Sequence, residues 1–247
     1  MITKTTADFS SIDFDKGEII LIDKSIDKSS FNVIYKIRKA VGVKKAGHAG
    51  TLDPKATGLL IICTGKKTKE ISSFQDQIKT YTGVITLGKK TLSMDSESEF
   101  IEENGIDGIS ESDILNTKER FTGDILQIPP MYSAVKFKGK SLYKYARKGI
   151  ELKREARPVH ISEFKITKID LPDVHFEITC TKGTYIRVIA HDFGEALGCG
   201  GYLSALRRTK IGAHDVAEAF TIDEFIECFG PAKYKDTAIP AAGVKAE

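Results

Sequence analysis

The sequence predicts an α+β fold built on a mixed, largely antiparallel central sheet that is flanked by helices. Apolar and polar residues alternate from Val174 to Thr181, a period of two that is typical of a strand with one buried face. Apolar residues between Phe31 and Val41 instead recur at helical spacing and predict an amphipathic helix. Strand-like and helix-like segments follow each other without the regular alternation of a parallel α/β sheet, which favours the mixed arrangement.

Hydrophobic runs and cap residues place the elements of the amino-terminal half. They are, in chain order, a strand over 18–23, a helix over 31–41 capped near Ser29 or Ser30, a buried strand over 59–63, a strand over 81–88, an acidic surface connection over 93–108, and a helix from the capping box Ser110-x-x-Asp113 to about Phe121.

The same signals place the elements of the carboxy-terminal half. They are a break at Pro129-Pro130, a basic surface subelement over 136–157, the strand over 174–181, a helix whose apolar face starts at Ile186, a last helix opened by Thr221-x-x-Glu224, and a loose tail over 230–247. We therefore expect one folded domain over residues 1–229.

Length and composition are those of a globular protein. The chain has 247 residues, of which 41% are hydrophobic and 29% charged, enough for a sizeable core. No apolar run approaches the roughly 18 residues of a membrane helix, and the first ten residues, MITKTTADFS, lack the apolar segment of a signal peptide. We therefore expect a cytoplasmic protein without membrane association. The cysteines stand far apart, which predicts buried thiols rather than a zinc site or disulfides. They are Cys63, Cys180, Cys199 and Cys228.

Positive charge is concentrated in two segments, although the net charge is only +3. Residues 136–157 contain nine Lys or Arg and two Glu, a second basic set lies over 36–45, and residues 91–113 contain eight acids and no Lys or Arg. Such segregation suits a polyanion held on one side, although a solvated charged surface explains the charge equally well. Three tyrosines in or beside the basic run favour nucleic acid, because aromatic rings stack on bases. They are Tyr132, Tyr143 and Tyr145.

Residues 47–58, GHAGTLDPKATG, contain a single acid, Asp53, among glycines and other turn-forming residues. On local chemistry alone an ordinary turn is the simpler interpretation, in which Asp53 caps a short helical turn begun at Pro54. The buried strand that follows favours a catalytic interpretation, since an acid on a rigid loop beside a sheet is well presented. The local pattern leaves both interpretations open.

The longer stretch GHAGTLDPKATGLLIICTGKKTK resembles the signature of the TruB family, bacterial tRNA pseudouridine synthases. Five further segments resemble that family in the same order, so that the resemblance runs from about residue 18 to residue 225. They are KTYTGVITLG, GDILQIPPMYSAVKFKGKSLYKYARKGIE, REARPV, CTKGTYIR and LGCGGYLSALRR.

The resemblance implies an enzyme with the pseudouridine synthase fold that isomerises the T-loop uridine-55 of tRNA, without a cofactor or metal. Its catalytic residues would be Asp53, which acts on C1′ or C6 of the uridine, Tyr81, which stacks on the base, and Arg187, which pairs with Asp53. Without the resemblance, Tyr81 is more simply a core or cross-strand aromatic. Arg187 stands near the amino end of a helix, where the dipole disfavours a cation, so an acid is expected beside it.

The resemblance also implies residues that contact the substrate. His48 would fill the space left by everted nucleotides, and Tyr185 and Leu206 would line the uracil pocket. Asp95 would contact RNA or Arg187.

Residues 129–157 would be the RNA-gripping thumb of the family, with Lys140, Lys144 and Arg147 as charge contacts to the RNA. Lys24 would be kept from the family's Lys-Pro-x-Gly motif, although this chain lacks the Pro and the Gly in Lys24-Ser25-Ile26-Asp27. Family members commonly carry a carboxy-terminal domain of the PUA type. Only 22 residues follow Phe225, so we expect no full PUA domain.

Two other functions stay open at this point. The chain could be a tRNA-binding folding chaperone with secondary or no isomerase activity, or a guide-dependent synthase that acts on ribosomal RNA. The joint presence of Asp53, Tyr81 and Arg187 favours an enzyme, because a pure binder needs none of them. We expect a monomer whose partner is the T-arm of tRNA, with no small-molecule cofactor.

Overall fold

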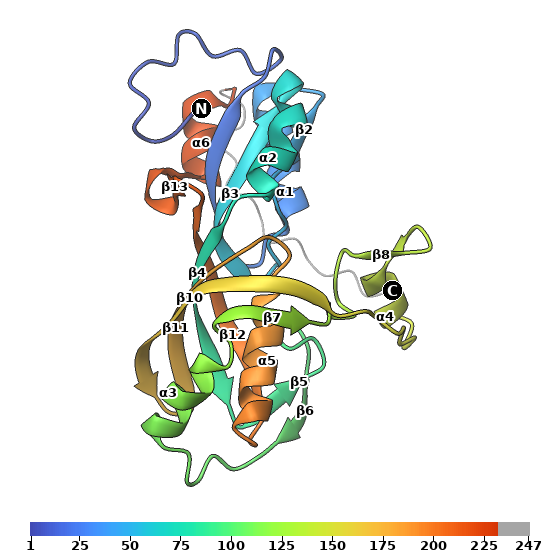
Figure 1. Cartoon of the computed structure of the whole chain (residues 1–247). Helices are drawn as coiled ribbons and strands as arrows, with labels where there is room; N and C mark the ends of the chain where they lie inside the picture. The colour runs from blue at the N-terminus through green and yellow to red at the C-terminus, as the bar shows by residue number, and fades with distance from the viewer. Residues whose placement is uncertain (232–247) are drawn as a thin grey trace.

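The computed structural model describes residues 1–231, and the predicted tail from 232 onward lies outside the described residues. Ten strands form one central sheet (Figure 1). They are β1 (Ile19–Lys24), β2 (Ala46–His48), β3 (Ala56–Thr64), β4 (Lys79–Leu87), β7 (Gly123–Gln127), β10 (Arg157–Asp170), β11 (Asp173–Cys180), β12 (Gly201–Ile211), β13 (His214–Asp215) and β14 (Phe220–Thr221).

The sheet is mixed and largely antiparallel, as predicted. Its strand order is β14-β1-β3-β12-β4-β11-β10-β7, with β13 paired to β12 and β2 paired to β3. The pairs β1–β14 and β3–β12 are parallel, and the other pairs are antiparallel. The β3–β12 pair joins segments about 150 residues apart in the chain and brings the loop before β3 beside the carboxy-terminal half.

Helices cover the sheet in separate hydrophobic clusters. On β3, Leu60 and Ile62 pack in a cluster with α1 (Ser30–Val41) and α6 (Ile222–Phe229). Leu59 and Ile61, which alternate with them, pack in another cluster with Phe74 of α2 (Ile71–Gln75). The largest cluster joins α5 (Ile186–Ala196) and α3 (Glu111–Glu119) to strands β4, β10, β11 and β12.

The predicted helix starts are confirmed by their caps. Ser29 caps α1, accepting a hydrogen bond from the Asn32 amide. The capping boxes at Ser110 and Thr221 are both formed, so α3 and α6 begin where the sequence placed them.

Two parts of the fold differ from the sequence-based expectation. The acidic stretch over 93–108 contains strand β6 (Phe100–Glu103), which pairs antiparallel with β5 (Lys89–Thr91). The ion pairs Lys89–Glu103 and Lys90–Glu102 connect the side chains of the two strands. The prediction of a plain surface connection was therefore wrong, because these cross-strand charges stabilise a hairpin with few apolar residues. The long strands β10 and β12 were also not predicted, since many of their residues are polar.

The basic segment forms a small substructure between β7 and β10. It holds β8 (Lys136–Phe137), β9 (Lys140–Ser141) and α4 (Leu142–Ala146), and Figure 1 shows it standing away from the sheet. No helix within residues 1–231 is long and apolar enough to cross a membrane. Three cysteines are buried as predicted, whereas Cys228 is exposed.

Candidate active site

The acid of the GHAGTLDPKATG stretch lies in the loop between β2 and β3. The Ala56 amide donates to the Asp53 carbonyl at 3.1 Å, which closes a turn over Asp53–Ala56. No helix begins there, so the predicted helix cap was wrong and the turn interpretation holds for the backbone alone. The Ser30 hydroxyl of α1 accepts from the Leu52 amide at 2.9 Å and donates to the Leu52 carbonyl at 3.0 Å. The loop is therefore held rigidly against α1.

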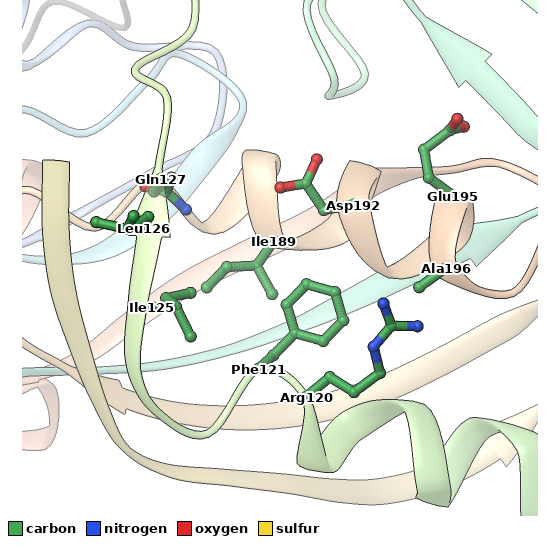
Figure 2. Close-up of a pocket in the computed structure, with 9 residues that line it drawn as sticks. All are labelled: Arg120, Phe121, Ile125, Leu126, Gln127, Ile189, Asp192, Glu195 and Ala196. Carbon is green, nitrogen blue, oxygen red and sulfur yellow. The ribbon is translucent and has the colours of Figure 1, made fainter. Parts of the chain in front are cut away.

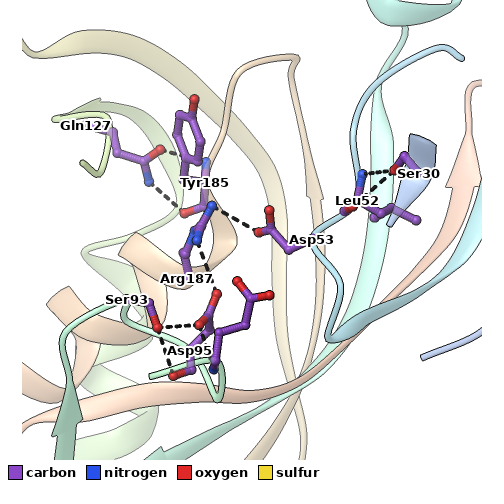
Figure 3. A network of polar contacts seen from close by, with 9 residues as sticks. Ser30, Leu52, Asp53, Ser93, Asp95, Gln127, Tyr185 and Arg187 are labelled. Carbon is purple, nitrogen blue, oxygen red and sulfur yellow. Dashed lines mark hydrogen bonds and ion pairs between the residues drawn. The ribbon is translucent and has the colours of Figure 1, made fainter. Parts of the chain in front are cut away.

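The Asp53 side chain pairs with a buried arginine. One guanidinium nitrogen of Arg187 lies 3.0 Å from Asp53 Oδ2, and another lies 3.2 Å from Asp95 Oδ2. Figure 3 shows Arg187 between the two carboxylates, with contacts to both. The Arg187 and Asp95 side chains are 6% and 7% exposed, whereas Asp53 keeps 38% of its surface. Of the three, Asp53 is the one that an arriving molecule can reach.

Local structure explains why Arg187 stands where it does. Arg187 is the second residue of α5, and the expected acid beside it is present twice. Tyr185 is the N-cap residue of the helix and makes no side-chain cap bond, but Gln127 of β7 bonds its backbone. The Gln127 amide accepts from the Tyr185 N–H at 2.7 Å and donates to its carbonyl at 3.1 Å (Figure 3). The start of α5, and Arg187 with it, is thus fixed to the edge strand β7.

Asp95 is itself held by its neighbours. The Ser93 hydroxyl donates to Asp95 Oδ1 at 2.6 Å, and the Glu97 amide donates to the same oxygen at 3.0 Å. Glu97 adds a third carboxyl beside the pair, and burial together with Asp95 and Asp53 raises the pKa of Glu97. The sequence did not single out Glu97, because it is one of eight acids over 91–113.

The pKa of Asp53 is raised above its ordinary value of 3.8. Burial is the main cause and the charge of Asp95 adds to it, whereas Arg187 and Lys24 oppose the rise. Pairing with Arg187 alone predicts a lowered value, but desolvation outweighs it here. A carboxylate that is costly to ionise and aligned by a guanidinium is a common feature of reactive sites.

Tyr81 lies on β4 with Ile178 and Arg208 as its neighbours across the sheet. Its side chain belongs to the largest hydrophobic cluster, which also contains Leu52 of the Asp53 loop. Burial raises the pKa of Tyr81, and the guanidinium of Arg208 opposes the rise. The phenol therefore stays protonated near neutral pH.

Arg208 was not predicted as a site residue, yet it is 1% exposed and joins the two ends of the Asp53 loop. Its Nε donates to the Leu59 carbonyl at 2.8 Å and one Nη donates to the Gly50 carbonyl at 3.1 Å. Gly58 has a φ of +102°, and a Cβ there would collide with the Arg208 backbone. Sequence reasoning could have found it only if β12 had been predicted as a strand, since one of the neighbours Arg207 and Arg208 must then face inward.

The predicted Lys24 lies beside this loop and is 1% exposed. Its ammonium donates to the carbonyls of Ser25 at 3.1 Å, Lys28 at 2.6 Å and Pro54 at 3.3 Å. Burial lowers the pKa of Lys24 to about 8, and the charge of Asp53 partly restores it. The ammonium thereby links the backbone of residues 25–28 to the Asp53 loop.

The other predicted residues fall into two groups. His48 lies half-buried at the end of β2, with a buried Nδ1 that has no partner among the described residues and a pKa lowered by burial. Leu206 is partly buried against the cluster that holds Tyr81. Lys140, Lys144 and Arg147 are exposed and belong to the projecting segment, not to the surroundings of Asp53.

A separate cavity of about 470 Å³ lies between α3, β7 and α5 (Figure 2). Arg120, Phe121, Ile189 and Asp192 are among its lining residues, whereas Asp53, Tyr81 and Arg187 are not. Among residues 1–231, no group of three or more His, Cys, Asp or Glu side chains is placed to hold a metal ion. The Asp53–Arg187–Asp95 arrangement remains the site with the clearest chemistry.

Comparisons with known proteins agree with this fold. The profile of the "TruB family pseudouridylate synthase (N terminal domain)" matches residues 38–186, and that of the "tRNA pseudouridylate synthase B C-terminal domain" matches residues 187–239. A tRNA pseudouridine synthase B of Chlorobaculum tepidum is 49% identical over 86% of this chain and 91% of its own length. One of Flavobacterium johnsoniae is 47% identical over 86% of this chain and 96% of its own.

Solved structures show the same fold. A chain of a Cbf5-Nop10-Gar1 complex superposes with a TM-score of 0.68 at 27% identity, covering 92% of this chain and 58% of that one. A chain of an H/ACA RNP bound to a substrate RNA superposes with a TM-score of 0.64 at 25% identity, covering 87% and 53%. This chain therefore spans little more than half of those two chains.

Fold and site together define a pseudouridine synthase, an enzyme that acts on RNA. Within that class, the chain belongs to the TruB family, and the relatives named above are tRNA pseudouridine synthases.

Proposed function

We propose that the protein isomerises the T-loop uridine-55 of tRNA to pseudouridine, with Asp53 as the catalytic carboxylate. The observation that carries the proposal is the solvent-accessible carboxylate of Asp53, which is paired with the buried Arg187 and lies within the residues that the family profile matches. Curated relatives at 47–49% identity are tRNA enzymes, which favours tRNA over guide-dependent modification of ribosomal RNA. As an enzyme of tRNA maturation it would act in the cytoplasm, as a monomer.

The reaction breaks the bond between C1′ and N1 of the uridine and forms a bond between C1′ and C5. C5 loses a proton and N1 gains one, so the atoms of uridine are conserved and no oxidant, reductant or group donor is consumed. The Asp53 carboxylate acts as nucleophile at C1′ or C6. Arg187 pairs with Oδ2 of Asp53, whose side chain is still 38% exposed, so part of the carboxylate is free to react.

A base within a folded tRNA loop must leave its stack before Asp53 can reach it. Tyr81 and Leu206 share a hydrophobic cluster, which offers an apolar surface for the everted uracil. The half-buried Tyr185 would line the pocket for the uracil, and the half-buried His48 would occupy space that the flipped nucleotide leaves. Tyr81, Leu206 and Tyr185 would contact the base, His48 would fill the vacated space, and Asp53 would perform the chemistry with the support of Arg187.

The projecting segment 129–157 would grip the RNA backbone. Charge reversal of Lys140, Lys144 and Arg147 to Glu is expected to weaken tRNA binding by about two orders of magnitude and to flatten the dependence of log Kd on log salt. The turnover rate at saturating tRNA is expected to stay unchanged. Binding titrations at several salt concentrations check this, and a salt slope equal to that of the wild type would remove the segment from the RNA interface.

Incubation with an unmodified tRNA transcript, followed by mapping of pseudouridine, tests the function. Product confined to position 55 supports the proposal, and product at another position would contradict it. A chaperone instead accelerates refolding of a misfolded transcript without forming product. Refolding assays on the same transcript therefore separate the two functions.

A further inference from the structure

The outer face of α1 combines exposed aromatic rings with positive charge. Phe31 is 69% and Tyr35 53% exposed, and residues four apart on a helix are surface neighbours. One turn further, Lys39 Nζ lies 5.6 Å from the centre of the Tyr35 ring. Residues 28–45 contain six Lys or Arg and no acid. Amphipathic helices expose polar side chains on this face, so folding does not explain the two rings.

The position of α1 relates this face to the active site. The Ser30 hydroxyl bonds the Leu52 amide and carbonyl, and the Asp27 amide donates to the Pro54 carbonyl at 2.9 Å. The inner face of α1 packs on β1 and β3, whereas the basic projection leaves the sheet between β7 and β10, at the other end of the strand order. The Asp53 loop thus lies against the start of α1, whereas the projection leaves from the opposite end of the strand order.

We propose that the Phe31–Tyr35 face of α1 binds tRNA outside the stem-loop that enters the active site. The two rings would stack on bases or riboses, and the surrounding cations would meet phosphates. The inference rests on the proposed function, since it takes tRNA as the ligand. RNA is favoured over a protein partner because the charge of the whole segment has one sign and complements a polyanion.

A second exposed phenylalanine provides the contrast. Phe100 on β6 is 54% exposed, and Lys89 Nζ lies 5.0 Å from the centre of its ring. The distance between ring and cation is therefore similar to that of the Tyr35–Lys39 pair, and the Phe100 ring also packs edge-on against Tyr202. The segment 91–113 around Phe100 carries eight acids and no Lys or Arg, however, so phosphates are repelled there. Phe100→Ala is the matched control.

The experiment measures Kd, KM and kcat for the double variant Phe31→Ala/Tyr35→Ala on two substrates, full-length unmodified tRNA and its isolated T-arm stem-loop. For full-length tRNA, Kd and KM are expected to rise at least about tenfold, since each stacked ring contributes about that much. Both constants for the stem-loop, and kcat for both substrates, should equal those of the wild type. Phe100→Ala should change none of them, and thermal unfolding checks that both variants are folded.

Several results would overturn the proposal. One is a double variant that binds full-length tRNA as tightly as the wild type does. Another is equal weakening of binding to full-length tRNA and to the stem-loop, which would place the face against the stem-loop itself. Self-association of the wild type that the double variant loses, with tRNA binding intact, would make the face a protein interface. Failure of the wild type to form pseudouridine in full-length tRNA would contradict the proposed function instead, while the binding titrations would still test the α1 face.

Discussion

Asp53→Asn is expected to reduce turnover by about four orders of magnitude or more, as loss of a catalytic nucleophile does, while tRNA binding stays within about threefold of the wild type. Asparagine has the shape of aspartate but no negative charge. The loop and the hydrogen bonds between Ser30 of α1 and Leu52 of the loop therefore stay intact. The carboxylate stabilises the transition state and contributes little to binding of the RNA in the ground state. Single-turnover rates and binding titrations on unmodified tRNA give the two values.

The chain offers a matched control for this variant. Asp23 is also an aspartate paired to an arginine, with Arg207 donating to its two oxygens at 2.9 and 2.7 Å. Asp23→Asn removes the same charge from the same kind of pair and is expected to leave turnover unchanged. Equal loss of turnover and of binding in Asp53→Asn would show that Asp53 is structural.

Arg187→Met is expected to lower kcat/KM by about three orders of magnitude and to lower the free energy of unfolding by about 3 kcal/mol at neutral pH. Removal of the guanidinium leaves Asp53 and Asp95 beside each other, and Asp95 is only 7% exposed. The pKa of Asp53, which Arg187 lowers in the wild type, then rises further, so Asp53 is protonated over a wider pH range. Unfolding in denaturant measures the free energy.

The pH dependence of this loss has a definite sign. A carboxyl whose pKa is raised in the folded state favours folding below its unfolded pKa and loses that contribution as pH rises through the folded value. The Arg187→Met deficit should therefore be largest near pH 7 and smaller near pH 4. Arg207→Met, which breaks a pair whose arginine is 40% exposed, is expected to cost less than about 1 kcal/mol. A larger deficit at pH 4 than at pH 7 would contradict this electrostatic explanation.

Much of the fold followed from local signals in the sequence. The alternation over 174–181 and the caps at Ser29, Ser110 and Thr221 all correspond to elements in the structure. Such signals depend on neighbours within a few residues. The hairpin β5–β6 depends on cross-strand ion pairs, and local periodicity does not report those.

The site could be predicted in part for the same reason. Local position at a helix start showed that Arg187 needs an acid, but only the fold brings Asp53 and Asp95 to it from 134 and 92 residues away in the chain. Arg208 was missed because its partners are backbone carbonyls, which every residue has. The raised pKa of Asp53 was also not predicted, since desolvation depends on packing that the sequence pattern does not show.

The pH dependence of the single-turnover rate in the wild type and in Asp95→Asn tests most directly whether an ionised Asp53 performs the chemistry. The rate should rise with pH to a plateau, with a midpoint above 3.8 in the wild type. Loss of the Asp95 charge should move that midpoint to lower pH, whatever happens to the plateau, because Asp95 raises the pKa of Asp53. A midpoint that stays in place or moves to higher pH in Asp95→Asn would contradict the assignment of Asp53.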